Sequence, residues 1–255
     1  MGIINLAHGA FYMLGAYVVY WLVGYTGNLF SAIALGLLIM LLFGYLLERL
    51  AVSYLYQRDH LYQVLLTYGL ILILDELQKI FWGTDFYSVP VPAVLAGSIP
   101  LTETQDYPIY RLFISLVCMA IAAGLYVLIG RTRIGMMIRA GASNREMSQL
   151  LGIDIGLVFA TVFSIGVALA AFSGMIGAPV SSVYPGMGDH ILIISFVVVV
   201  IGGIGSVKGA FVGAMLIGIS DTFGQVLLPD FASVVVYAVM AMVLLWRPQG
   251  LFGEA

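Results

Sequence analysis

The chain has 255 residues, of which 62% are hydrophobic and 9% charged, and its net charge is −3 at pH 7. Soluble domains contain roughly 45–50% apolar and about 25% charged residues, so this composition excludes that class and indicates an integral membrane protein. A closed β-barrel also satisfies its backbone hydrogen bonds in lipid, but its strands alternate apolar and polar residues. Runs such as LFSAIALGLLIMLLFGYLL do not alternate. The sequence therefore predicts an all-α protein.

The longest apolar runs predict a polytopic helical bundle of about eight transmembrane segments. A bilayer core of about 30 Å requires about 20 helical residues, and each run is close to that length. The predicted spans are residues 6–24, 29–47, 61–82, 109–130, 157–180, 190–206, 209–228 and 231–246. We expect them to form a single transmembrane domain over residues 1–255.

The placement of basic residues predicts the orientation of the bundle. Several arginines share the connection between the fourth and fifth spans, namely Arg131, Arg133, Arg139 and Arg145. Residues 83–108 contain acidic residues but no Lys or Arg. Because cytoplasmic loops are enriched in Lys and Arg, the first connection is predicted to be cytoplasmic and the second external. Both ends of the chain then lie in the cytoplasm.

The cytoplasmic connection, residues 131–156, contains a predicted helix of about two turns. Ser143 followed three residues later by Glu146 is the pattern of a capping box. Gly152 supplies the left-handed residue that commonly ends helices. The helix is therefore predicted over residues 144–151.

This predicted helix has one apolar face, because Met147, Leu150 and Leu151 follow the spacing i, i+3, i+4. Two interpretations are open. The helix lies on the membrane surface or under its own bundle, or it docks on a cytoplasmic partner. In the second case, the flanking Arg139 and Arg145 would orient the partner by charge.

Small residues recur every four positions in two of the spans. One series is Gly166, Ala170, Gly174 and Ala178, and the other is Gly205, Gly209 and Gly213. This spacing lets helix backbones approach closely in lipid. The segment from Gly202 to Lys208 is so rich in glycine that it also predicts a helix break or a tight turn.

Polar groups mark the start of the chain as well, in the stretch NLAHG. HGAF at residues 8–11 and KGAF at residues 208–211 form a weak internal repeat, and paired interruptions of this kind point to a substrate path. Broken helices are tolerated in a membrane only where they line protein or a polar cavity. The residues predicted to lie along the path are Asn5, His8, Gly9, Gly202, Gly203, Gly205 and Lys208.

Other ionisable residues do not form a catalytic or metal-binding pattern. Asp75, Glu76 and Lys79 have helical spacing that lets the lysine neutralise a carboxylate locally, as a structural ion pair or as a substrate contact. The sequence lacks the phosphate-binding motif G-x-x-x-x-G-K-[ST]. We therefore predict no catalytic residue, no metal and no cofactor in this chain.

Four stretches together resemble a known family. They are GIINLAHGAFYMLGAY at residues 2–17, RTRIGMMIRAGASNREMSQLLGIDI at 131–155, GGIGSVKGAFVGAMLIG at 202–218 and RPQGLFG at 247–253. In combination they are similar to the membrane permease subunits of bacterial ABC importers for branched-chain amino acids. The form NLAHG favours the LivH-type permease within that family.

The resemblance implies the ABC importer permease fold in a bacterial inner membrane. It also implies partners: a second homologous permease, two cytoplasmic ATPase subunits that bind the ATP, and a periplasmic or lipid-anchored substrate-binding protein. Membrane lipids would surround the chain, and no nucleic acid is expected. The predicted loop helix then becomes the element that couples to the ATPase, through Arg139, Ser143, Asn144, Glu146, Met147, Leu150, Leu151 and Gly152.

Other functions remain open alternatives. An ion-coupled secondary transporter would also fit the repeat and the acidic residues of the third span, and permeases similar to this family carry urea or short amides. A membrane enzyme acting on lipid is disfavoured, because no paired acid–base or metal set occurs. Genes for ATPases and a binding protein beside this one would distinguish an ABC permease from a secondary transporter.

Members of the family usually carry a hydrophobic segment before the GIINLAHG motif. We therefore expect the DNA upstream of Met1 to continue in frame into an apolar segment of about 20 residues. Sequencing that region tests the expectation, which a stop codon directly upstream would contradict.

Overall fold

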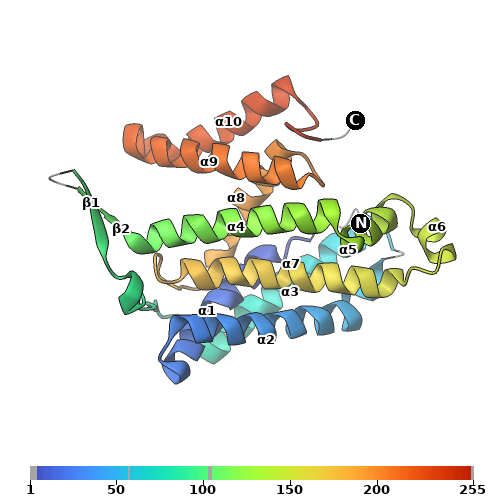
Figure 1. Cartoon of the computed structure of the whole chain (residues 1–255), viewed down its shortest axis with the longest axis horizontal. Helices are drawn as coiled ribbons and strands as arrows, with labels where there is room; N and C mark the ends of the chain where they lie inside the picture. Colours follow the sequence, from blue (N-terminus) through green and yellow to red (C-terminus); the bar gives the residue numbers. More distant parts are fainter. Residues whose placement is uncertain (1–4, 57, 103–104, 254–255) are drawn as a thin grey trace. The chain divides into compact units, whose positions relative to one another are not determined.

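The computed structural model describes residues 5–56, 58–102 and 105–253, which are mainly helical (Figure 1). The α-helices are α1 (His8–Thr26), α2 (Leu29–Leu50), α3 (His60–Trp82), α4 (Ile109–Arg131), α5 (Arg133–Ser143), α6 (Arg145–Leu150), α7 (Ile155–Gly177), α8 (Met187–Gly202), α9 (Val207–Leu227) and α10 (Ala232–Trp246). Short 3₁₀ turns are η1 (Val52–Leu55), η2 (Ala93–Leu95) and η3 (Pro229–Phe231). The strands are β1 (Ser98–Thr102) and β2 (Gln105–Pro108).

Each of the eight predicted spans corresponds to one helix, so the all-α membrane fold is confirmed. Among the described residues, α2, α4, α7 and α9 are long and apolar enough to cross a membrane, and α8 and α10 are shorter apolar helices. The predicted end of the sixth span is wrong, because α8 stops at Gly202 rather than at residue 206. Gly203 and Gly205 have φ of 96° and 87°, which glycine adopts easily and a helix does not. The predicted tight turn therefore lies between α8 and α9.

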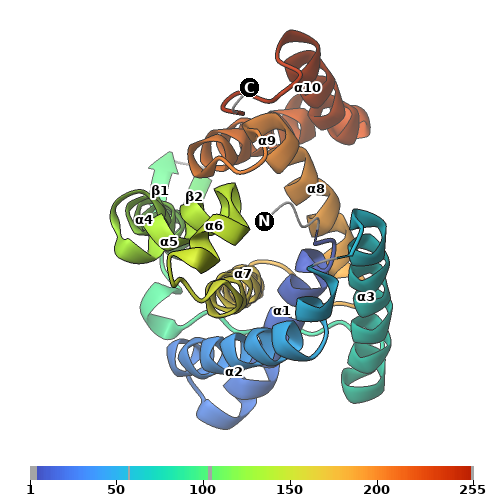
Figure 2. The same cartoon turned by 90° about the vertical axis from the view of Figure 1, so that its right-hand side faces the viewer.

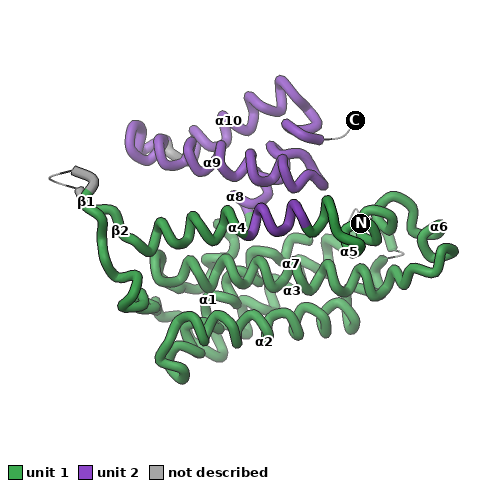
Figure 3. The backbone as a smooth tube through the Cα atoms, in the orientation of Figure 1, with its two compact units in different colours: residues 1–120, 128–192 green, residues 121–127, 193–255 purple. Residues whose placement is uncertain are grey.

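The chain forms two compact units, shown in different colours in Figure 3. Unit 1 contains residues 1–120 and 128–192, and unit 2 contains residues 121–127 and 193–255. In unit 2, α9 packs against α10. Its buried core consists of Val197, Ile201, Ile217 and Val236.

Unit 1 is organised around α7, which packs against both α1 and α2. A side chain at Gly15 of α1 would meet the backbone of Ala171 in α7, and one at Gly174 would meet the backbone of Tyr12. On the α2 side, a Cβ atom at Gly44 would lie 3.1 Å from the Cα atom of Ser164. The close approach predicted from the small-residue spacing is thus confirmed for Gly174.

The connections of unit 1 gather at its two ends. At one end, Tyr56 from the segment after α2 contacts Arg145 of α6 and Phe159 of α7; Figure 2 looks at the unit from this side. At the other end, Tyr87 pairs with Val183 through two backbone hydrogen bonds of 2.9 and 2.8 Å. Part of residues 131–156, predicted to be cytoplasmic, therefore lies at the same end of unit 1 as the segment after α2. Part of residues 83–108, predicted to be external, contacts the segment after α7 at the other end.

An antiparallel hairpin in the connection predicted to be external is not expected from the sequence. Strands β1 and β2 pair Ser98 with Pro108 and Pro100 with Asp106, and the register shifts between Pro100 and Thr102. Proline disfavours strands because it cannot donate to the ladder. The two prolines therefore conceal the hairpin from a pattern-based prediction.

The α1–α7 contact leads to a prediction about stability. Replacing Gly15→Leu should destabilise the folded chain by about 3 kcal/mol or more, because the new side chain overlaps backbone that cannot move away. The measurement is thermal unfolding in detergent. Gly24→Leu is the matched control, because Gly24 lies in the same helix with nothing within 4 Å of its Cβ position. Equal losses in both variants would contradict the packing role of Gly15.

Candidate functional site

The predicted cytoplasmic helix exists as α6, but its amino-terminal cap differs from the prediction. Ser143 is the last residue of α5, and the cap is Asn144, whose Oδ1 atom accepts a hydrogen bond of 2.9 Å from the Met147 amide. Asn144 is extended, with φ −147° and ψ 102°, and it caps helices as well as serine does. The predicted capping box is therefore wrong. Glu146 is instead an acidic residue in the first helical turn, where its negative charge stabilises the helix by interacting with the helix dipole.

The carboxyl-terminal end of α6 agrees with the prediction. Gly152 has φ of 82°. Its amide donates to the Gln149 carbonyl at 2.9 Å, and the Ile153 amide donates to the Ser148 carbonyl at 3.1 Å. These two bonds form a Schellman motif. The helix is thus closed at both ends by local hydrogen bonds.

The apolar face of α6 is exposed, as the spacing predicts. Met147, Leu150 and Leu151 are 56%, 82% and 77% exposed. Ser148, in the same helix, is buried, and its hydroxyl donates to the Asn144 carbonyl at 2.8 Å. A helix held on one side therefore presents three large apolar side chains on the other.

The preceding helix α5 is a structural element that the sequence analysis missed. Thr132 caps it by accepting a 3.1 Å hydrogen bond from the Gly135 amide. The spacing of Ile134, Met137 and Ile138 is i, i+3, i+4, a signal that could have identified this helix. Met137 and Ile138 pack with the buried residues of α7 near its start.

The two flanking arginines face their own subunit. The Arg139 guanidinium donates to the Ile129 carbonyl near the end of α4. The Arg145 guanidinium lies over two aromatic rings, 5.6 Å from the Tyr56 centroid and 5.5 Å from the Phe159 centroid. Both side chains therefore anchor residues 131–156 to their own subunit.

Three of the predicted pathway residues lie in unit 1, at the start of α1. The Asn5 Oδ1 atom accepts a 3.0 Å hydrogen bond from the Ala7 amide. His8 begins the helix and is exposed, and its Nδ1 atom lies 3.1 Å from the Asn5 carbonyl oxygen. A Cβ atom built at Gly166 would lie 3.6 Å from the Nε2 atom of His8. An imidazole thus stands at the surface of the unit.

The interpretation of Gly9 as a helix break is wrong. The helix continues through Gly9, which is buried. A Cβ atom at Gly188, in the first turn of α8, would lie 2.8 Å from the carbonyl carbon of Gly9. Glycine is required at this place by the contact between two backbones.

The other predicted pathway residues lie in unit 2. The Ser206 hydroxyl caps α9 by accepting a 3.0 Å hydrogen bond from the Gly209 amide. Lys208 is exposed, and its ammonium group lies 5.2 Å from the centroid of the Tyr126 ring. Gly202 packs backbone to backbone against Gly209. The repeated stretches HGAF and KGAF therefore share one feature: the glycine of each meets a glycine of α8.

The RPQGLFG motif has a structural role that the sequence analysis did not identify. The Leu251 amide donates to the Ile201 carbonyl at 2.8 Å, and the Phe252 amide donates to the Gly202 carbonyl at 3.1 Å. Gly250, with φ of 82°, lies against Gly203. The motif therefore satisfies carbonyl groups that the end of α8 leaves free.

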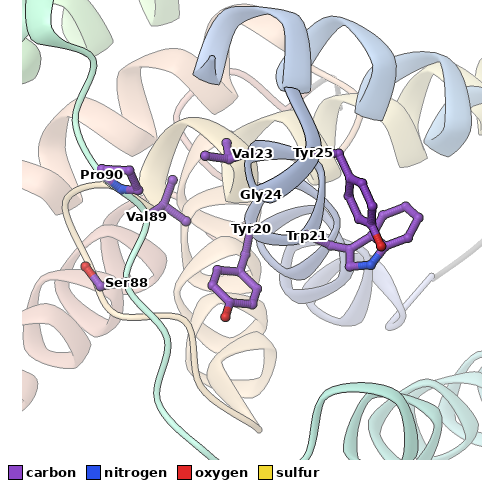
Figure 4. Close-up of a pocket in the computed structure, with 8 residues that line it drawn as sticks. All are labelled: Tyr20, Trp21, Val23, Gly24, Tyr25, Ser88, Val89 and Pro90. Carbon is purple, nitrogen blue, oxygen red and sulfur yellow. The ribbon is translucent and has the colours of Figure 1, made fainter. Parts of the chain in front are cut away.

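A cavity of about 460 Å³ opens at the end of unit 1 that carries residues 83–95. Its lining is mainly aromatic and apolar and is drawn in Figure 4: Tyr20, Trp21, Val23, Gly24, Tyr25, Ser88, Val89 and Pro90. None of the predicted pathway residues lines it. The cavity thus belongs to the predicted external end, away from the start of α1.

The charged residues of the third span are partly paired as predicted. The Lys79 Nζ atom lies 2.6 Å from the Glu76 Oε1 atom, and both side chains are exposed. The local neutralisation of one carboxylate is therefore confirmed. Asp75 is half-buried on the same helix.

Comparison with known proteins gives the family. The protein family described as the permease component of branched-chain amino acid transport systems matches residues 1–244. BraD, the high-affinity branched-chain amino acid transport permease of Pseudomonas aeruginosa, is 31% identical over all of this chain and 87% of its own length. LivH, the corresponding permease of Escherichia coli K12, is 28% identical with the same coverage. No solved structure matches significantly. The chain belongs to the family of branched-chain amino acid transport permease components.

Proposed function

We propose that the chain is the membrane-spanning subunit of a bacterial ABC importer that passes branched-chain amino acids from an external binding protein to the cytoplasm. The observation that carries the proposal is the family match over residues 1–244. The exposed apolar face of α6 supports it, because an importer permease must present a surface to the subunit that supplies its energy. ATP binds to partner subunits, and this chain has no enzymatic role of its own.

The proposed assembly contains a second permease of the same family and two ATPase subunits. The ATPase receives α6 in a groove, with Met147, Leu150 and Leu151 buried in the contact. Their exposure of 56–82% in the isolated chain supports this, since large apolar side chains in a cytoplasmic segment are otherwise left in water.

The proposed orientation places α5, α6 and both ends of the chain in the cytoplasm. The grouping of the arginine-rich segment with residues 48–59 at one end of unit 1 supports it, since basic residues favour the cytoplasmic side. Residues 83–108 then face the periplasm, and the cavity lined by Trp21 and Tyr25 lies at the periplasmic end of unit 1.

The substrate proposal rests on the relatives. The names of BraD and LivH specify branched-chain amino acid transport, and no observation favours urea, short amides or ion-coupled transport. We further propose that Asn5, His8, Gly9 and the set Gly202, Gly203, Gly205 and Lys208 lie near the permeation path. The exposure of His8 and Lys208 supports this, because lipid disfavours an imidazole or ammonium group.

The coupling proposal predicts the effect of a charge on α6. Leu150→Glu should reduce ATP hydrolysis stimulated by the loaded binding protein more than tenfold, because a carboxylate in a desolvated contact removes a central anchor. The measurement is ATPase activity of the reconstituted importer. Gln149→Glu adds the same charge at the neighbouring exposed position of the same helix and should retain coupling. Normal stimulation in Leu150→Glu contradicts the docking of α6.

The pathway proposal predicts the behaviour of His8. We expect His8→Ala to lower uptake severalfold at every pH from about 5.5 to 8, a window around the ordinary imidazole pKa of about 6.5. A pH-independent loss indicates a packing or polar role rather than proton transfer. His8→Gln, which keeps a polar side chain, should transport better than His8→Ala.

A chemical measurement completes this test. In a Cys118→Ser background, which removes the chain's one cysteine, His8→Cys should react with membrane-impermeant thiol reagents. Normal uptake by both histidine variants, together with an unreactive thiol, would show that the site is not on the path.

A further inference from the structure

A buried carboxylate lies beside the coupling segment. Glu48, near the end of α2, is fully buried. Its Oε1 atom accepts a 2.6 Å hydrogen bond from the Tyr56 hydroxyl, and its Oε2 atom lies 3.9 Å from the Nε atom of Arg49. Buried carboxylates are rare and require partners. The Tyr56 hydroxyl is therefore the group that holds this carboxylate.

The same tyrosine contacts α6 through its ring. Tyr56 and Phe159 form an edge-to-face pair with centroids 5.2 Å apart and an interplanar angle of 75°. The Arg145 guanidinium lies 5.6 and 5.5 Å from these two centroids. Since Arg145 is the first residue of α6, a chain of contacts joins the buried carboxylate to the start of the coupling helix.

Each contact in this chain strengthens the next. A phenol that donates to a carboxylate gains electron density in its ring, and an electron-rich ring attracts a cation more strongly. Burial, followed by the hydrogen bond to Glu48, raises the pKa of Tyr56, so the phenol stays protonated and remains a donor. The guanidinium in turn places positive charge over the Tyr56 ring.

The coupling helix depends on such anchors. Helix α6 has only 6 residues, and helices this short are not stable by themselves. The Asn144 cap and the Gly152 turn close its ends, but local bonds do not determine which way its faces point. Its orientation must come from tertiary contacts, and the Arg145 contact supplies one that uses charge.

We propose that Tyr56 is a positioning residue that, held by Glu48, fixes the orientation of α6 through Arg145. The importance of this orientation for transport rests on the proposed function, because α6 is the element that meets the ATPase. Movement of the segment after α2 would thereby be transmitted to the coupling helix without direct contact between that segment and the partner.

The direct test is hydrogen–deuterium exchange of the full chain in lipid nanodiscs, without ATPase subunits. Tyr56→Phe, which keeps the ring but releases it from Glu48, should accelerate exchange in the peptide covering residues 147–153 by up to about fivefold, the factor for complete loss of a partly exposed cation–π contact. Tyr54→Phe is the matched control, since Tyr54 lies in the adjacent η1 turn and is 73% exposed. Equal exchange in the two variants overturns the proposal.

Tyr56→Phe leaves the buried Glu48 carboxylate without its hydrogen-bond donor. A second pair of variants, at Arg145, keeps that hydrogen bond. Arg145→Ala should accelerate the same exchange, and Arg145→Lys should restore part of the protection because it keeps a cation over the rings. Combining Tyr56→Phe with Arg145→Ala should add nothing to Arg145→Ala alone, because the Tyr56 hydroxyl acts on α6 only through the ring that Arg145 contacts. Fully additive effects contradict the chain of contacts.

ATP hydrolysis separates this proposal from the proposed function. In the reconstituted importer, Tyr56→Phe should lower stimulation by the loaded binding protein about twofold or more with the KM for ATP unchanged. Faster exchange with unchanged stimulation keeps Tyr56 as the residue that positions α6 and contradicts instead the coupling role of α6.

Discussion

The close contact of α7 with α1 is the constraint on which unit 1 depends. In lipid, no hydrophobic force draws apolar helices together, so association relies on packing at short range. Gly15 and Gly174 allow the two helices to come this close, because each glycine faces the backbone of the opposite helix. This packing fixes α1, which begins at His8, against α7. Helix α7 in turn supports residues 131–156 through Phe159.

The spans could be predicted because helix length in a bilayer is set by thickness. Their ends were less predictable. The cluster of glycines predicts that a break falls between α8 and α9. The exact end of α8 at Gly202 depends on the positive φ angles of Gly203 and Gly205, which the sequence does not specify. Gly9 was misinterpreted because glycine serves both breaks and close contacts, and the partner of Gly9, Gly188, is distant in sequence.

At the candidate site, periodicity predicted the exposed face of α6, and glycine chemistry predicted its end. The cap was assigned one residue early because Ser143 and Asn144 are both good caps, and the choice depends on where α5 ends. The contacts of Glu48, Tyr56 and Arg145 could not be predicted from the sequence. They require knowing which connections meet at the same end of the unit.

The hydrogen bonds from Leu251 and Phe252 to the end of α8 have a consequence for the order of biosynthesis. Helix α8 leaves the ribosome well before its carbonyl partners do, and α9 and α10 are made in between. The carbonyl groups of Ile201 and Gly202 therefore gain these partners only after residues 251 and 252 have been synthesised. Unit 2 can close this contact only after α9 and α10 have been made, so the contact forms late and joins residues that are distant in sequence.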